Sequence, residues 1–279
     1  MNPPQVSSLL LEDTQNQAAP WPIFIDAVGV CGLRLPVHVA DRARGAQLVT
    51  ATLSLSASLA HDAKGSHMSR FVEVLEEARS QVFTPLRLAT VLDELRRRLQ
   101  ARQATLEMAF PFFLERRAPH TGAAALMDYS CTYAVTTDDT GPAGRRFVLT
   151  VEAPVAALCP CSKAISDYGA HNQRGRIRME ITPRRAMDGG WDMPAIEECI
   201  TLAEGAASSP VYPLLKRPDE RVVTMRMYEN PVFVEDMARH TAAALMADER
   251  VQAFRVHAET LESIHNHNAF ARIAWTRDS

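Results

Sequence analysis

The order of secondary structure that the sequence predicts occurs twice along the chain, and this repeat limits the folds open to it. In the first half, alternating apolar and polar residues rich in β-branched side chains predict strands at 24–37, 46–60, 104–115 and 125–137. Helical periodicity predicts helices at 69–81 and 85–102, between the second and third strands. The predicted order is therefore strand, strand, helix, helix, strand, strand.

After a turn-rich break, "TDDTGPAGR", the second half follows nearly the same order. It is predicted to contain strands at 146–158, 174–185, 251–263 and 269–275. Helices are expected at 193–207 and 231–248, and the β-branched residues of 221–229 favour a short strand there. The repeat is one of pattern and not of letters, with one irregular insertion.

This repeat predicts an α+β chain of two tandem modules, each a four-stranded antiparallel sheet with a helix pair on one face. We place the first module at 23–140 and the second at 141–279, after a polar, proline-containing mobile arm at 1–22. Sheets of this kind end in open edges, which other subunits commonly cover or extend. Oligomerisation is therefore expected.

Composition narrows the classes of function. The formal net charge is -3, so no overall basic field points to nucleic acid. We expect no membrane span, because no apolar run reaches about 18 residues, and no signal peptide. Five cysteines, an odd number, favour free thiols in a reducing cytoplasm.

The stretch "LCPCSKAISDYGAHNQRGR" gathers residue types that seldom suit a core. Cys159 and Cys161 are followed by His171, and thiolate and imidazole are the usual ligands of zinc and its neighbours. The alternative is a pair of buried thiols and a surface histidine. The polar residues that crowd the same stretch weaken that alternative.

A second polar stretch, "ETLESIHNHNAF", lies near the chain end. It contains two carboxylates and two histidines that can act as metal ligands or as a proton-transfer pair: Glu259, Glu262, His265 and His267. On an extended chain Glu262 and His265 would face opposite sides, whereas a turn can bring them together. The alternative is a polar loop between the last two strands.

Three further segments are charged and have ordinary structural explanations. "YPLLKRPDE" holds Lys216, Arg217, Asp219 and Glu220, and could be only a charged loop. Glu235 lies in the first turn of a predicted helix, where the helix dipole stabilises a carboxylate. Alternatively, its carboxylate could accept two parallel N–H bonds from a planar ligand, such as a purine with adjacent N–H groups. "KGSHMSRF" presents Lys64, His67, Ser69 and Arg70 at a helix start, either as an anion site or as a cap.

Together, "CPCSKAISDYGAHNQRG", "KGSHMSRF", "YPLLKRPDE", "YENPVFVEDMAR" and "ESIHNHNAFA" resemble the type IB GTP cyclohydrolases, from about Pro22 to the chain end. That family converts GTP to 7,8-dihydroneopterin triphosphate and formate, the first step towards folate. The resemblance implies the tunnelling fold, a homotetramer with active sites at subunit interfaces, and one divalent metal per site. Zinc and manganese are both implied, and iron(II) is compatible with the ligand types.

The resemblance also implies roles for individual residues. Cys159 is the favoured metal thiolate, with Cys161 as the alternative, and His171 is the imidazole ligand. Glu220 and His265 are the next candidates, as ligands or as metal-site partners. Glu235 resembles the glutamate that anchors the purine, and Glu262 would lie beside His265. For the chemistry itself we expect His265 or His267 to protonate N7 of guanine, and Glu262 and the histidines to serve the later proton transfers. The triphosphate would meet local positive groups and a helix start: Lys163, Arg174, Lys216, Arg217, His67 and Arg70.

Two other classes remain open at this point. One is a related tunnelling-fold enzyme acting on another pterin or deazapurine, such as the queuosine-pathway nitrile reductase, which needs a nucleophilic cysteine, a nicotinamide cofactor and no metal. The other is a non-catalytic scaffold stabilised by metal. Metal content and GTP turnover separate these classes.

Overall fold

The computed structural model describes residue 15 and residues 18–278. Most of the arm predicted at 1–22 lies outside the described residues. The first half has the predicted order: β1 Ile25–Asp41, β2 Gly45–Leu59, α1 Ser69–Ala78, α2 Pro85–Leu99, β3 Gln103–Arg117 and β4 Ala124–Asp138.

The second half keeps the four predicted strands and adds short elements between them. Its strands are β5 Arg146–Leu158, β6 Asn172–Arg185, β7 Trp191–Asp192, β8 Ser209–Pro210, β9 Val251–Thr260 and β10 Ala269–Thr276. Its helices are α3 Pro160–Ile165, α4 Ile196–Gly205, α5 Arg217–Glu229 and α6 Val234–Ala247, and a 3-10 turn, Gly141–Gly144, joins the halves.

All the long strands form one antiparallel sheet in the order β1-β2-β3-β4-β5-β6-β9-β10. The halves are joined directly, because β4 pairs with β5 from Ser130–Glu152 to Thr136–Arg146. Within the described residues, β10 pairs only with β9, and β1 pairs only with β2 apart from an isolated bridge between His38 and Val82. The sheet therefore has two largely open edges.

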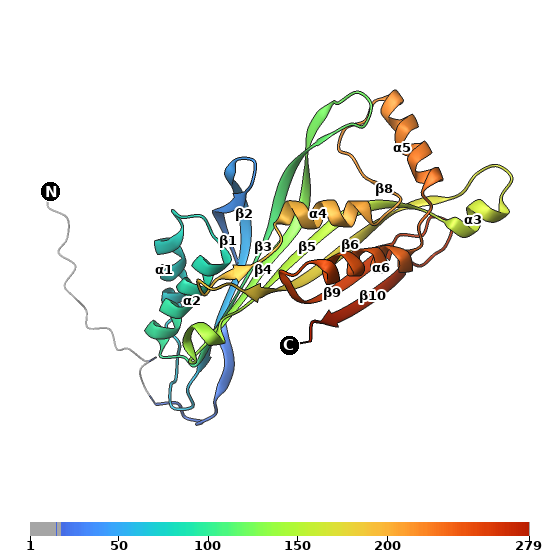
Figure 1. Cartoon of the computed structure of the whole chain (residues 1–279). Coiled ribbons are helices and arrows are strands. Elements are labelled where there is room, and N and C mark those ends of the chain that lie inside the picture. Colours follow the sequence, from blue (N-terminus) through green and yellow to red (C-terminus); the bar gives the residue numbers. More distant parts are fainter. Residues whose placement is uncertain (1–14, 16–17, 279) are drawn as a thin grey trace, which may run out of the picture.

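The helices cover one face of this sheet, with α1 and α2 at one end and α4 and α6 over the second half (Figure 1). Burial alternates along the strands, as it does in Val37, Val39, Leu53 and Leu55, which face the helices. The opposite face is mainly polar and charged, as at Arg176, Arg178 and Arg255, but it also exposes Leu48, Leu126 and Phe270. One hydrophobic core runs through both halves.

The segment 221–229, predicted as a strand, is helical, so that prediction was wrong. Its β-branched residues lie inside α5, which begins earlier, at Arg217, with Pro218 in its first turn. A proline there has the backbone torsion a helix needs and loses no helical hydrogen bond. The start of the helix, and not the β-branched run, decided the local structure.

Asp219 holds the start of α5 against the β3–β4 turn. Its side chain is completely buried and accepts the N–H groups of His120 (2.9 Å), Thr121 (2.8 Å) and Lys216 (3.0 Å), and the Thr121 hydroxyl (2.7 Å). Burial alone would raise the pKa of Asp219, but these donors outweigh it and hold that pKa well below its usual range.

Because the folded-state pKa is lowered, the stabilisation from Asp219 is full above about pH 4 and is lost as the pH falls through the folded-state pKa. Asp219→Asn puts an N–H₂ group where two donors now meet an oxygen. We expect its melting temperature to fall by several degrees at neutral pH, with the gap from wild type narrowing in acid. Circular dichroism melts across this pH range measure both effects. The exposed Glu249→Gln is the control, and an unchanged Asp219→Asn melt would contradict the role.

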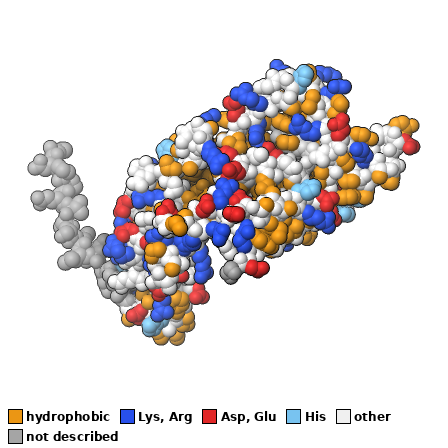
Figure 2. Space-filling view, in the orientation of Figure 1, with side chains coloured by type: hydrophobic (Ala, Val, Ile, Leu, Met, Phe, Trp, Pro, Cys, Tyr) orange, Lys and Arg blue, Asp and Glu red, His pale blue; other side chains and the backbone are white. Residues whose placement is uncertain are grey.

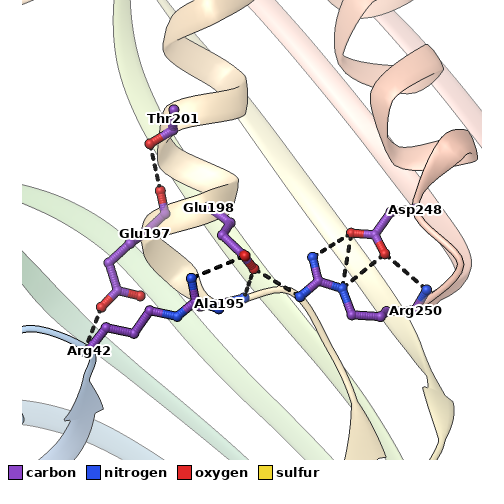
Figure 3. A network of polar contacts seen from close by, with 7 residues as sticks. All are labelled: Arg42, Ala195, Glu197, Glu198, Thr201, Asp248 and Arg250. Carbon is purple, nitrogen blue, oxygen red and sulfur yellow. Dashed lines mark hydrogen bonds and ion pairs between the residues drawn. The ribbon is translucent and has the colours of Figure 1, made fainter.

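A polar network joins the two halves on the helix side of the sheet (Figure 3). Glu198, at the start of α4, contacts Arg42 of the β1–β2 turn (3.1 Å) and Arg250 before β9 (3.0 Å). Its carboxylate also accepts the Ala195 N–H (2.7 Å). Partly exposed ion pairs contribute about 0–1 kcal/mol each, so this network sets positions more than stability.

Among the described residues, none of the helices combines the length and apolar character needed to cross a bilayer.

Candidate functional site

Two polar loops meet at one end of the sheet. The first runs from Cys159 to His171 between β5 and β6, and the second covers 261–268 between β9 and β10. β6 pairs with β9 up to Gly175–Thr260, and the Leu261 N–H donates to the Arg174 carbonyl (2.8 Å). This pairing brings together segments almost a hundred positions apart in sequence.

Cys159 and His171 are adjacent at the base of the first loop. The Cys159 N–H donates to the His171 carbonyl (3.1 Å), and both residues are half-buried. Ser162 links them further, because its hydroxyl donates to the Cys159 carbonyl (3.1 Å) and accepts the His171 N–H (3.2 Å). The Cys159 Sγ accepts the Ser162 N–H at 3.4 Å, so the short helix α3 fixes the sulfur position.

The His171 ring is connected to the second loop. Its Nδ1 lies 2.9 Å from Gln173 Oε1 and 3.3 Å from Ser263 Oγ. Gln173 Nε2 donates to Glu262 Oε1 (3.3 Å), which also accepts the Thr260 hydroxyl (2.7 Å). His171 and Glu262 were predicted from the sequence, whereas roles for Gln173, Thr260 and Ser263 were not. The sequence signal for these three residues is only a polar side chain close to a predicted ligand.

The side chains of Cys159 and His171 are of the types that bind divalent cations, because thiolate and imidazole are ligands of zinc and chemically similar metals. Within the described residues, however, no group of three or more His, Cys, Asp or Glu side chains is gathered so that it could hold a metal ion. The described chain therefore supplies two candidate ligands, on residues whose backbones are hydrogen bonded to each other, for a metal shell that needs more ligands. The predicted ligand set stays a prediction.

The other predicted ligands lie apart from this pair. Cys161 is exposed on α3, and Glu220 is exposed in the first turn of α5. The far end of α5 is the part that approaches α3, where Lys163 donates to the Tyr228 carbonyl and sits 4.3 Å from the centre of its ring. Glu220 lies about 12 Å along the helix from Tyr228.

The second loop presents its two histidines to solvent. The rings of His265 and His267 stack with centroids 5.1 Å apart, and His267 Nδ1 lies 3.3 Å from Asn266 Oδ1. At the base of the loop, Glu259 accepts hydrogen bonds from Asn268 and Arg176, which lower the pKa of Glu259 below its usual value. The loop is thus anchored beneath the histidines.

The predicted substrate-binding residues occupy different places in the fold. Glu235 is exposed in the first turn of α6, Arg174 is exposed on β6, and Lys216 and Arg217 lie at the start of α5. This position of Glu235 fits both a helix-dipole carboxylate and a purine anchor.

His67 and Arg70 lie at the start of α1, at the opposite end of the molecule from α3 (Figure 1). Arg70 donates to the Arg98 carbonyl (2.7 Å), and His67 has a positive φ of 49°. Ser69 is not the cap, since Met68 occupies that position without a side-chain cap hydrogen bond. Residues at the two ends can share one site only if two chains contribute to it.

Solved structures of urate oxidases share this architecture. The enzyme from Bacillus subtilis 168 aligns with a TM-score of 0.55 over 90% of this chain and 98% of its own, at 8% identity. A highly active mutant of the Bacillus sp. TB-90 enzyme gives 0.54 over 91% and 100%, at 9% identity. At such identity the likeness shows the fold alone. The chain is an α+β protein of the tunnelling-fold class.

Sequence comparison identifies the family within this class. A family model described as type I GTP cyclohydrolase FolE2 matches residues 11–271. The GTP cyclohydrolase FolE2 of Desulfovibrio desulfuricans is 44% identical over 263 residues, covering 94% of this chain and 97% of its own. That of Akkermansia muciniphila is 45% identical with the same coverage. The chain belongs to the FolE2 family of type I GTP cyclohydrolases.

Proposed function

We propose that this chain is a GTP cyclohydrolase that converts GTP to 7,8-dihydroneopterin triphosphate and formate, as the first step of folate biosynthesis. The observation that carries this proposal is the meeting of the two motif loops through the hydrogen bonds from His171 to Gln173 and from Gln173 to Glu262. Family membership over nearly the whole chain supports the same activity.

Cys159, or Cys161 in its place, and His171 would hold one divalent ion. Glu220, which lies apart from this pair within one chain, would be a further ligand or site partner only where a neighbouring chain brings it to the site. Zinc, manganese and iron(II) all suit a mixed sulfur, nitrogen and oxygen shell. When bound, the ion supplies Lewis acidity that activates water for addition to C8 of guanine. The arrangement of Cys159 and His171 supports this assignment because their backbones are joined directly.

The remaining steps depend on protons moved by the second loop. His265 or His267 protonates N7 as the five-membered ring of guanine opens. A histidine side chain suits this role because histidine ordinarily titrates near neutral pH. Glu262 and the histidines then serve hydration of the formyl carbon, opening of the ribose and closure of the new ring. Each acid–base contribution is about 10²–10⁴-fold.

Glu235 would anchor guanine through N1–H and the 2-amino group. The triphosphate would be held by local positive side chains, drawn from Lys163, Arg174, Lys216, Arg217, His67 and Arg70. Arg70 and His67 would come from a neighbouring chain, because they lie at the opposite end from α3 (Figure 1).

We propose a homotetramer in the cytoplasm, with active sites at subunit interfaces. Two features support the assembly. The outer edges of β1 and β10 are largely open within the described residues.

Hydrophobic side chains are also exposed beside the site: the exposed fraction is 86% for Ile165, 101% for Tyr168 and 64% for Ile264. Figure 2 shows hydrophobic side chains at the end of the molecule where α3 lies.

The activity is tested with protein stripped of metal and resupplied with zinc, manganese or iron(II). We expect formate and a dihydroneopterin triphosphate, detected as fluorescent neopterin after oxidation, and no product with chelator. If none of the metals yields formate or fluorescent pterin, the assignment is wrong.

The same preparation separates the other classes. A metal-stabilised scaffold would lose its fold on chelation, whereas a catalytic site loses activity while the circular dichroism spectrum is kept. A nitrile reductase would consume a reduced nicotinamide cofactor without added metal.

A further inference from the structure

Gln173 stands between the His171 ring and the Glu262 carboxylate. Gln173, His171 and Glu262 are half-buried, and Thr260, which also donates to Glu262, is 2% exposed. The order of contacts is Glu262 Oε1, Gln173 Nε2, Gln173 Oε1 and His171 Nδ1, at 3.3 Å and 2.9 Å.

The direction of these hydrogen bonds follows from the groups at each end. A carboxylate only accepts, so Glu262 must face the N–H₂ group of Gln173. The Gln173 carbonyl oxygen then faces His171 and also only accepts. The proton of the neutral His171 ring must therefore be on Nδ1, and the lone pair is left on Nε2.

The position of Ser263 is consistent with a proton on His171 Nδ1. Its hydroxyl lies 3.3 Å from the same His171 Nδ1 and can rotate to accept from it. Both side chains near Nδ1 can therefore serve as acceptors, and within the described part of the chain the hydrogen bonds of the ring are made by Nδ1 and not by Nε2.

We propose that Gln173, oriented by Glu262, is a positioning residue that sets His171 in the tautomer whose Nε2 can ligate a metal ion. The inference rests on the proposed function, in which His171 is a ligand. Ligating histidines commonly donate their other N–H to an oxygen, and loss of that partner typically costs about 10–100-fold in metal affinity. The competing explanation is that Gln173 only ties β6 to the second loop.

The tautomer is measured first, on wild-type metal-free protein labelled with ¹⁵N-histidine, at about pH 8, where an unperturbed imidazole is neutral. Nitrogen chemical shifts distinguish protonated from unprotonated ring nitrogens. We expect His171, assigned by its absence in His171→Asn, to carry its proton on Nδ1. A proton mainly on Nε2 overturns the proposal.

Metal affinity is measured next, by competition of zinc or manganese with a chromophoric chelator. Gln173→Leu should weaken binding about 10–100-fold. Gln252→Leu is the matched control, because Gln252 is a half-buried strand glutamine that donates to the Arg277 carbonyl (3.2 Å) outside the site. Equal affinities in wild type and Gln173→Leu overturn the proposal.

A reversed pair provides the sharpest comparison. Gln173→Glu alone places two carboxylates together and should disturb the loop. Gln173→Glu combined with Glu262→Gln restores a carboxylate that accepts from both His171 Nδ1–H and the new amide. We expect the double variant to regain metal affinity and the wild-type tautomer, even where turnover stays low because Glu262 has gone.

If Gln173 only ties β6 to the second loop, the double variant should not recover both metal affinity and the wild-type His171 tautomer. A double variant that is folded but recovers neither of them contradicts the proposal. If wild-type protein binds no metal, the proposed metal-dependent function is wrong. The His171 tautomer in the metal-free protein still reports on Gln173, so the two failures can be told apart.

Discussion

Cys159→Ala and His171→Ala should each reduce GTP turnover by about a thousandfold or more, because the water activation that a bound ion provides is equivalent to lowering a water pKa from about 15.7 toward about 7. Each variant should also retain less metal after dialysis, since a shell with few protein ligands loses affinity when one is removed. The fold should persist, because both residues lie at the end of the sheet and outside its core. Formate release, metal content and circular dichroism on the same samples measure the three effects.

Cys161→Ala is the matched control for the thiolate. Cys161 is exposed and lies two residues from Cys159 in the same short helix region. We expect Cys161→Ala to keep most of its metal. If Cys159→Ala remains fully active while Cys161→Ala is inactive, the ligand is Cys161 and the assignment of Cys159 is wrong.

Glu235→Gln should lose GTP turnover while metal content is unchanged, because the anchor would lie across the base from C8. The change replaces one acceptor oxygen with a donor that opposes a guanine N–H. A site whose polar groups are hydrogen bonded to the substrate can discriminate by about 10⁴–10⁵-fold against an analogue that leaves those groups unpaired. Wild-type protein should accordingly prefer GTP strongly over inosine triphosphate, which lacks the 2-amino group, and over ATP.

The competing role of Glu235 has a different outcome. Glu235 lies in the first turn of α6, where a carboxylate stabilises the helix by about 0.3–1 kcal/mol. If that is its only role, Glu235→Gln would melt slightly earlier and keep its turnover and base preference. Asp236→Asn, in the same turn, controls for the helix contribution.

Local sequence pattern was sufficient for the long elements of the fold. Strands such as β3 and β4 were predicted because their side chains alternate between a buried and an exposed face. The sequence pattern gave a wrong prediction for α5, where the helix start at Arg217 and Pro218 outweighed the β-branched residues that follow. It did not predict α3, which has only six residues. Short elements bury too little surface to leave a periodic pattern.

The site was predictable in its residue types but not in its connections. Cys159, His171 and Glu262 stood out as chemistry-bearing residues in polar surroundings. Their approach depends on the pairing of β6 with β9, which no local pattern encodes. Gln173 was missed because an amide next to a ligand has no spacing signature, and its role depends on which group lies on each side.

The direct pairing of β4 with β5 determines how this molecule can move. Closure of two domains around a ligand requires a hinge, where a few residues change their backbone torsions while the flanking bodies stay rigid. Here a ladder of backbone hydrogen bonds crosses the boundary from Ser130–Glu152 to Thr136–Arg146, so the paired strands do not provide such a hinge between the halves. A change of shape at the site would therefore be confined to segments such as the loops 159–171 and 261–268, and motions of loops occur on the order of nanoseconds to microseconds.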